Sequence, residues 1–368
     1  MTAALLWILL AQDSIPKFRE ELVDDRLDDL WACTVADVNG DGKPDIVALN
    51  WNPAYVVWYE NPSWKKHFLV QDGPRELVSI APIRIEGKTA FLLGAGYKEP
   101  PDPRKGGGEI YLLQRPDDPT KPWTPLKVGE SPTLHRIHPL GSRDALCSSL
   151  HGVNGAELFV LRQPPDPGHD AWTRELIAGD LHTIHNTWSG DFEGDGALQV
   201  IAASAEGLTL FRRTSPGTWS RRTLSKGAPG SSEVAVGRLP GGKSYLAAIE
   251  PHHGHEFVVY TGPEWTRKVL KVNKGGHTLA TADLLGTGVD SLLVGFVGQY
   301  SNHPGGPLWQ VYHPRDAQGA SWESVVLDDT RLPGEDGLFY DLNGDGRPDV
   351  VLAGGKRVKI YWNEGPGR

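Results

Sequence analysis

Three segments of the chain carry the same acidic loop, at residues 37–45, 191–199 and 341–349. Each loop has oxygen-bearing side chains at positions 1, 3 and 5 and glycine at position 6. A short apolar run follows each loop, such as Ile46–Leu49. Such a run is typical of a buried strand rather than of the helix that follows an EF-hand loop. The loops therefore mark a repeated β unit, and this repetition limits the possible folds more than any other feature.

Tryptophan indicates the length of the repeat. Six tryptophans open similar segments, for example Trp172-Thr-Arg-Glu-Leu-Ile and Trp265-Thr-Arg-Lys-Val-Leu. They recur at intervals of roughly 46 to 59 residues, the size of one four-stranded propeller blade. The tryptophans are Trp64, Trp123, Trp172, Trp219, Trp265 and Trp322.

The last unit is incomplete. It begins near Pro333 and ends at Trp362 without an outer strand, whereas Phe18–Val23 has the right character for the missing strand. Pairing of the two would remove the open sheet edges. We therefore predict an all-β fold: a seven-bladed β-propeller of four-stranded blades, closed by an N-terminal outer strand. The repeats continue without a linker, so we expect one domain over residues 15–365.

Composition agrees with this fold. Of 368 residues, 44 are glycine and 29 are proline, as expected for a turn-rich β protein. The net charge of −9 and the lack of a Lys/Arg cluster argue against nucleic acid as a partner. Cys33 and Cys147 fall in strands of non-adjacent blades, so we expect two free, buried thiols.

The N-terminus has an apolar run at Ala3–Ala11. It is far shorter than the ~20 residues needed to cross a bilayer. It is similar to the core of a secretory signal with cleavage near Ala11. We therefore expect residues 1–11 to be a signal peptide and the protein to be secreted or periplasmic, without a membrane span. The alternative is a disordered or misassigned N-terminus.

The acidic loops suit a hard cation, since Ca²⁺ takes oxygen ligands from a tight turn. Asp, Asn and Gly also form turns without metal, which is the alternative. Gln199 replaces the carboxylate at position 9 of the second loop, which weakens that site. We expect structural, non-catalytic Ca²⁺ in these loops. The expected ligands are Asp37, Asn39, Asp41 and Asp45, then Asp191, Glu193 and Asp195, and then Asp341, Asn343, Asp345 and Asp349.

Acidic loops of this kind, each inside a β repeat, resemble the FG-GAP/VCBS repeats of integrin-like propellers. The resemblance covers nearly the whole chain and implies the propeller fold. It implies little about function, because such propellers serve as adhesion modules, lyases and scaffolds.

Histidine is unevenly distributed over the predicted blades. The acidic turn follows the innermost strand, so the loops before that strand and after the second strand lie on the opposite face. Ten of the 13 histidines map to that face. Converging imidazoles suit transition-metal binding or acid–base catalysis near neutral pH. The alternative is that these histidines pack the channel or are solvated.

The densest segment is Glu250-Pro251-His252-His253-Gly254-His255. Three or four neutral imidazoles from different blades could hold Zn²⁺ or a similar divalent ion with an open position. We expect catalytic roles for His138, His185, His253, His277 and Glu250. We expect substrate contacts from His135, His182, His252, His255, Tyr97, Trp51 and Tyr300.

Three motifs are similar to those of the propeller of aldos-2-ulose dehydratases and their bacterial relatives. They are Glu250-Pro251-His252-His253-Gly254, Gly275-Gly276-His277 and His185-Asn186. The resemblance implies removal of water from keto-sugars such as anhydrofructose, with His185, His253 and His277 as the matching positions. A metal would polarise the carbonyl, a neutral His would take the proton, and a protonated His or Glu250 would assist loss of the hydroxyl.

Two other functions stay open. A polysaccharide lyase acting on uronates would need cationic or phenolic groups, for which Arg136, Lys98, Tyr97 and Tyr300 are candidates. A non-catalytic, Ca²⁺-braced propeller could bind sugars or proteins without turnover. The sequence leaves the oligomeric state open.

Overall fold

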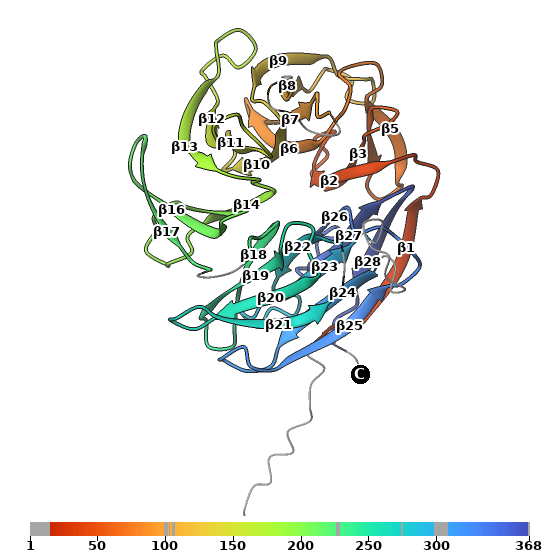
Figure 1. The fold of residues 1–368 in the computed structure, drawn as a ribbon. Coiled ribbons are helices and arrows are strands. Elements are labelled where there is room, and N and C mark those ends of the chain that lie inside the picture. Colours follow the sequence, from red (N-terminus) through yellow and green to blue (C-terminus); the bar gives the residue numbers. More distant parts are fainter. Residues whose placement is uncertain are drawn as a thin grey trace, which may run out of the picture.

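The computed structural model of the chain describes residues 15–98, 102, 104, 107–225, 229–273, 275–297 and 308–366. These residues form seven four-stranded antiparallel sheets. Figure 1 shows the sheets arranged around one centre, with one strand of each sheet innermost. The predicted seven-bladed β-propeller is therefore confirmed. The segment 1–11 lies outside the described residues.

Each blade runs outward from an innermost strand, and blades one to seven follow chain order. The innermost strands are β2 (Leu30–Ala36), β6 (Ser79–Ile85), β10 (Leu134–Leu140), β14 (Asn186–Gly190), β18 (Glu233–Arg238), β22 (Gly276–Ala282) and β26 (Asp336–Tyr340). The second strands are β3 (Asp45–Asn50), β7 (Lys88–Ala95), β11 (Asp144–Ser149), β15 (Gln199–Ser204), β19 (Ser244–Glu250), β23 (Ser291–Phe296) and β27 (Asp349–Gly354).

The third strands are β4 (Tyr55–Glu60), β8 (Glu109–Gln114), β12 (Ala156–Arg162), β16 (Gly207–Ser215), β20 (Glu256–Thr261), β24 (Leu308–Pro314) and β28 (Arg357–Asn363). The outer strands are β5 (Lys65–Val70), β9 (Pro125–Glu130), β13 (Thr173–Leu181), β17 (Thr218–Thr223), β21 (Thr266–Val272), β25 (Trp322–Asp328) and β1 (Phe18–Asp24). The six repeated tryptophans lie at the start of the outer strands of the first six blades or within two residues of it, as predicted.

The core lies between neighbouring blades. Every residue of β3, β15, β23 and β27 is buried, because adjacent blades cover both faces of these strands. Trp58 of the first blade and Phe91 of the second belong to one apolar cluster, and each further pair of neighbours shares its own. Cys33 and Cys147 are buried free thiols, as predicted. No helix among the described residues is long and apolar enough to span a bilayer.

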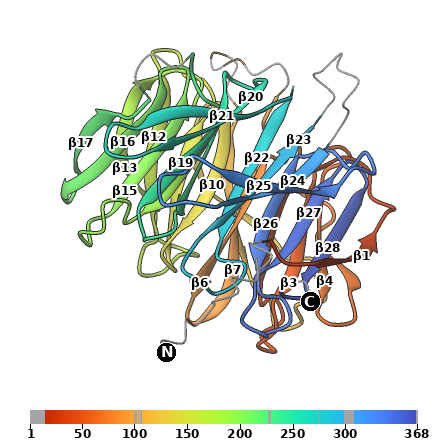
Figure 2. The same cartoon turned by 90° about the horizontal axis from the view of Figure 1, so that it is seen from below.

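The N-terminal strand closes the ring. β1 pairs with β28 in antiparallel register, with Arg19 opposite Trp362, and Figure 2 shows the two strands side by side. Lys359 reinforces this closure, because its Nζ lies 2.8 Å from Glu20 of β1 and 2.7 Å from Asp328 at the end of β25. The predicted outer strand is therefore present.

The innermost strands separate two ends of the propeller. In the fourth blade, His185 immediately precedes β14 and Asp191 immediately follows it. In the sixth blade, His277 lies at the start of β22 and Asp283 follows its end. We call the two faces the histidine end and the loop end.

Candidate functional site: a histidine cluster at one end of the channel

Five histidines from four consecutive blades meet at the histidine end. His135 lies in β10, His185 precedes β14, His252 and His253 lie in the turn after β19, and His277 lies in β22. The ring centroid of His185 is 4.6 Å from those of His135 and His253. It is 5.0 Å from those of His252 and His277. We call these five residues the histidine cluster.

Three members of the cluster offer nitrogen atoms to one point. Ligand atoms of His185, His253 and His277 all lie within 4.8 Å of one another. A tight turn brings His253 inward, because this residue adopts a left-handed φ of 45°. At Gly254 an added Cβ would lie 2.1 Å from the carbonyl oxygen of Glu250, so the turn requires glycine there. The left-handed backbone conformation that places this imidazole is therefore locally strained.

The proton positions of two rings follow from their partners. The Nδ1 of His185 lies 3.2 Å from the carbonyl oxygen of Ser232 and 2.6 Å from Oε1 of Glu233. The Nδ1 of His277 lies 2.9 Å from the carbonyl oxygen of Glu335. Because a carbonyl oxygen can only accept, both Nδ1 atoms donate. Each neutral ring therefore carries its lone pair on Nε2.

A third ring completes this arrangement. The Nε2 atoms of His253 and His185 lie 2.8 Å apart. Since His185 carries its lone pair on Nε2, the Nε2–H of His253 donates to it. His135 donates its Nδ1–H to the carbonyl oxygen of His185, 3.0 Å away. His135, His185 and His253 are thus connected by hydrogen bonds, and the rings of His252 and His277 contact that of His185.

A network of buried hydrogen bonds holds His185 in place. Asn186 donates its amide hydrogen to Oε2 of Glu233, the carboxylate that also accepts from His185. The Oδ1 of Asn186 accepts the backbone N–H of Thr187 at 2.8 Å and lies 2.8 Å from the Nε2 of His138. Glu233 is completely buried. This network fixes the orientation of the His185 ring.

Burial keeps the histidines neutral at physiological pH. It lowers the pKa of His253 to about 2 and that of His277 to about 3. It lowers the pKa of His138 and His252 to about 4. Burial also holds the pKa of His135 and of His185 well below the usual value. Neutral imidazoles with free lone pairs are the form that binds metal ions.

The pKa values of acidic groups near the cluster are raised rather than lowered. Burial raises the pKa of Glu233 and of Glu335 to about 8, and the nearby charge of Arg136 opposes this rise. These groups line a cavity of about 260 Å³ together with His138 and His277. Every innermost strand contributes to its wall, so the cavity is the central channel.

Two other predicted residues occupy different environments. Glu250 is buried at the end of β19 and accepts hydrogen bonds from two residues of the same blade, Tyr260 at 2.5 Å and Arg267 at 2.8 Å. His182 is exposed and its Nδ1 lies 2.7 Å from Oε1 of Glu206. The structure therefore does not bring Glu250 or His182 into the cluster. Two carboxylates that the sequence motifs did not identify lie beside it: Glu233, 2.6 Å from the Nδ1 of His185, and Glu335, 4.0 Å from the Nδ1 of His277.

The remaining predicted substrate contacts do not lie together. Tyr97 is buried, with its ring centroid 5.4 Å from that of His135. Trp51 stacks on Trp31 at the same end of the propeller. His255 is exposed in the turn after β19, and Tyr300 lies outside the described residues.

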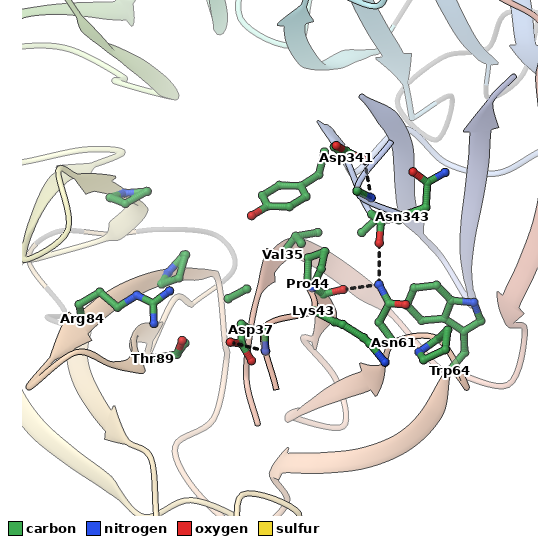
Figure 3. Close-up of a pocket in the computed structure, with 18 of the residues that line it drawn as sticks. Val35, Asp37, Lys43, Pro44, Asn61, Trp64, Arg84, Thr89, Asp341 and Asn343 are labelled. Carbon is green, nitrogen blue, oxygen red and sulfur yellow. Dashed lines mark hydrogen bonds between the residues drawn. The ribbon is translucent and has the colours of Figure 1, made fainter. Parts of the chain in front are cut away.

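The acidic loops lie at the loop end, where two of them border a hollow of about 1170 Å³. Figure 3 shows Asp37, Asp341 and Asn343 at its wall. Asp37 accepts the backbone N–H of Gly40 at 2.6 Å and that of Gly42 at 3.1 Å. Asp341 accepts two equivalent N–H groups, each at 2.8 Å. The first and seventh loops are thus closed in the same way.

The loop of the fourth blade differs in its electrostatics. Arg212 lies 3.0 Å from Glu193 and also contacts Asp195, so a guanidinium group already compensates these carboxylates. Gln199 accepts the N–H of Phe192 at 2.6 Å and takes the place of the buried aspartate of the other loops. Calcium binding in the three loops stays a prediction.

Comparison with known proteins supports the architecture. A family model described as an FG-GAP-like repeat matches residues 341–368. Aldos-2-ulose dehydratase of Phanerodontia chrysosporium is 27% identical over 234 residues, which are 52% of this chain and 26% of that protein. The chain thus spans about a quarter of the length of this relative. The resemblance to FG-GAP repeats and to the dehydratase propeller is confirmed at this level.

Solved structures share the fold at low sequence identity. BBS1N in complex with ARL6DN has a TM-score of 0.59 at 13% identity, covering 95% of this chain and 97% of that one. Saccharomyces cerevisiae Sqt1 has a TM-score of 0.54 at 12% identity, covering 96% and 99%. YCF48 bound to D1 peptide has a TM-score of 0.53 at 13% identity, with the same coverage. At this identity the likeness shows the fold alone.

Proposed function

We propose that this propeller is a metal-assisted lyase that removes water from a keto-sugar at the histidine cluster. The observation that carries the proposal is the meeting of His185, His253 and His277, whose ligand atoms lie within 4.8 Å of one another. The similarity to Aldos-2-ulose dehydratase supports a sugar substrate and loss of water, as the name of that protein says.

The residues of the cluster fit a divalent transition metal such as Zn²⁺. They are neutral imidazoles, and hydrogen bonds to Nδ1 leave the lone pairs of His185 and His277 on Nε2. His253 would complete a set of three ligands once a metal ion displaces the hydrogen that joins its Nε2 to the Nε2 of His185. Three protein ligands leave a position for substrate. A bound metal supplies a Lewis acid that polarises the ketone oxygen and acidifies the neighbouring C–H bond.

His252 is the solvent-exposed member of the cluster, with its ring 4.4 Å from that of His253. Its low pKa keeps it neutral, so we assign it the removal of the proton next to the ketone. The bond from the β-carbon to its hydroxyl oxygen then breaks, and the imidazolium returns the proton to that oxygen. Water leaves, and a carbon–carbon double bond conjugated with the ketone remains. Glu250, engaged by Arg267, takes no part.

The acidic loops have a separate role in this proposal. Ca²⁺ held by the loops at 37–45 and 341–349 braces the loop end, where the ion is far from the reacting groups. The fourth-blade loop is the weakest of the three sites, because Arg212 already pairs with Glu193 and Asp195.

The test combines metal content with turnover. Purified protein, treated with a strong chelator and then reloaded with Zn²⁺, is incubated with anhydrofructose and with glucosone, and formation of the conjugated enone is followed by ultraviolet absorbance. We expect stoichiometric metal, turnover lost on chelation and turnover restored on reloading. Metal binding without turnover of either sugar would favour a binding propeller, and absence of stoichiometric metal would overturn the proposal.

A further inference from the structure

A second hollow lies at the histidine end, between the first two blades. It has a volume of about 450 Å³, and its walls are the turn 51–54 after β3 and the segment 71–76 before β6. We propose that this hollow binds a neutral sugar ring. Together with the proposed function, on which this extension rests, it names an uncharged oligosaccharide as the substrate class.

Trp51 provides an aromatic wall to the hollow. Its ring stacks on Trp31 with centroids 4.9 Å apart and an interplanar angle of 17°. Trp31 covers one face of the indole, so the part that borders the hollow is its other face or its edge. The C–H face of a pyranose is apolar and packs on such a surface, while its hydroxyl groups point outward.

Polar side chains surround this indole. Within the described residues, none of them makes a hydrogen bond or ion pair through its side chain, so their donors and acceptors are available to hydroxyl groups. A hollow lined by an indole and by amide, carboxylate and guanidinium groups suits a polyol better than an apolar ligand. The polar residues are Asn52, Gln71, Asp72, Arg75 and Glu76.

The charge of the hollow selects among sugars. Asp72 and Glu76 contribute two carboxylates, against the single guanidinium of Arg75. The excess negative charge repels the carboxylate of a uronate. The hollow therefore fits a neutral hexose unit, which distinguishes it from the groove of a lyase that acts on uronate polymers.

Hydrogen bonds from neighbouring segments hold both walls in place. The backbone N–H of Trp51 donates to Asp29 at 2.8 Å. The side-chain amide of Asn50 donates to the carbonyl oxygen of Pro53 at 2.7 Å. On the other wall, the carbonyl oxygen of Glu76 accepts the N–H of Tyr97 at 3.1 Å. A site held in this way loses little conformational freedom on binding.

Aromatic contacts connect the hollow with the histidine cluster. The ring of Trp31 contacts that of Tyr97 at 5.8 Å between centroids. Tyr97 in turn contacts His135, at 5.4 Å. A chain of contacting aromatic rings, in which Tyr97 and His135 are buried, therefore links the wall of the hollow with the cluster at the same end of the propeller.

The experiment is calorimetric titration of the whole chain with maltotriose, cellotriose and trigalacturonate. We expect one of the two neutral trisaccharides to bind and trigalacturonate to bind at least about tenfold more weakly. Trp51→Ala is expected to raise the Kd of the neutral sugar at least about tenfold. Tyr340→Ala, at the exposed aromatic of the other large hollow, is the matched control and should leave the Kd unchanged.

Two further variants keep the test decisive. Gln71→Ala with Asp72→Ala changes only exposed side chains, and it should weaken binding even where Trp51→Ala lowers stability. His185→Ala should bind the neutral sugar as the wild type does, so failure of catalysis and failure of this site are distinguishable. No binding of either neutral sugar, equal binding of trigalacturonate, or binding that survives both hollow variants would overturn the proposal.

Discussion

The two ends of the innermost strands use opposite chemistry on one scaffold. At the histidine end, neutral imidazoles lie against buried carboxylates whose pKa values are raised, such as Glu233. At the loop end, carboxylates such as Asp37 are partly exposed and accept backbone N–H groups from their own turn. Burial, rather than residue type alone, separates a nitrogen site for a borderline metal from oxygen sites for a hard cation.

The comparison also shows how differently the two ends depend on sequence. The loop end is built from contiguous residues, so each loop carries its own ligands. The histidine end is built from single residues in different blades, so no one blade contains the site. A change at one position of the histidine end is therefore expected to cost more function than a change in one loop.

Removal of a cluster histidine is expected to have the largest effect among the tests that compare the two ends. His185→Ala removes one of the three converging nitrogens, and we expect the affinity for Zn²⁺ to fall by more than about 100-fold, beyond the usual effect of a supporting residue. Elemental analysis and a competition titration with a chromophoric chelator measure it. His182→Ala is the control, because this histidine pairs with Glu206 at the surface. Equal metal loss in both variants would contradict the assignment.

Glu233→Gln tests the support of His185. The amide still accepts a hydrogen bond but cannot ionise. Above about pH 8, where the buried Glu233 is charged, the imidazole of the variant therefore keeps its position and loses basicity. We expect the affinity for Zn²⁺ to fall by about 10–100-fold, as is typical for residues that orient metal ligands. Glu206→Gln serves as the matched control, since Glu206 contacts only the peripheral His182. An unchanged metal affinity in Glu233→Gln would show that Glu233 has only a packing role.

Calcium removal tests the loop end. At free Ca²⁺ of about 100 times the Kd, one occupied loop contributes about 2.7 kcal/mol to the free energy of unfolding. We expect EGTA to lower the melting temperature of the wild type and to have little effect on a variant with Asp37→Ala and Asp341→Ala. Asp191→Ala, in the loop already paired with Arg212, should keep most of the response. An EGTA response that is independent of all three positions would count against calcium in these loops.

Acid titration of the metal-free protein gives the smallest expected effect. His138 has its pKa lowered to about 4 in the folded state, so it favours unfolding as the pH falls from about 6.5 to 4. Asp45 has its pKa raised to about 6 by burial, so its contribution to stability is lost as the pH rises from about 4 to 6. The two ends therefore have opposite pH slopes in one window.

Urea unfolding between pH 4 and pH 7 with chelator present measures both slopes. His138→Gln removes a group that binds a proton more readily in the unfolded state. The free energy of unfolding is therefore expected to fall less steeply towards acid, by the contribution of one proton. Asp45→Asn is expected to remove the loss of stability that Asp45 causes as the pH rises from about 4 to 6. Slopes that change in the same direction would show that burial does not control these groups as we infer.

The fold was predictable because its signals repeat. The acidic loops recur in three blades, a tryptophan lies at or beside the start of six outer strands, and apolar second strands recur throughout. An error in one blade is therefore corrected by the others. Closure by Phe18–Asp24 followed from counting strands, since one blade lacked a partner that the N-terminus could supply. Single residues of the site have no such redundancy.

Glu250 and Glu233 show this limit. Glu250 adjoins the histidine-rich turn in sequence, but it is the last residue of β19, and its side chain bonds to Tyr260 and Arg267 of its own blade. Glu233 is distant in sequence from every histidine of the cluster, and only the ring arrangement brings it to His185. Aligning the starts of the innermost strands would have revealed it, because Asn186 and Glu233 both open such a strand.

Closure through β1 has a consequence for biosynthesis. The segment Phe18–Asp24 leaves the ribosome before every other strand, yet its partner Arg357–Asn363 is the last to be made. Until that partner is made, this first strand has no sheet to join, and the nascent blades expose an open sheet edge. Nascent chains that lack Arg357–Asn363 should therefore be the form most open to chaperones and proteases, and pairing of this strand with Phe18–Asp24 should end that exposure.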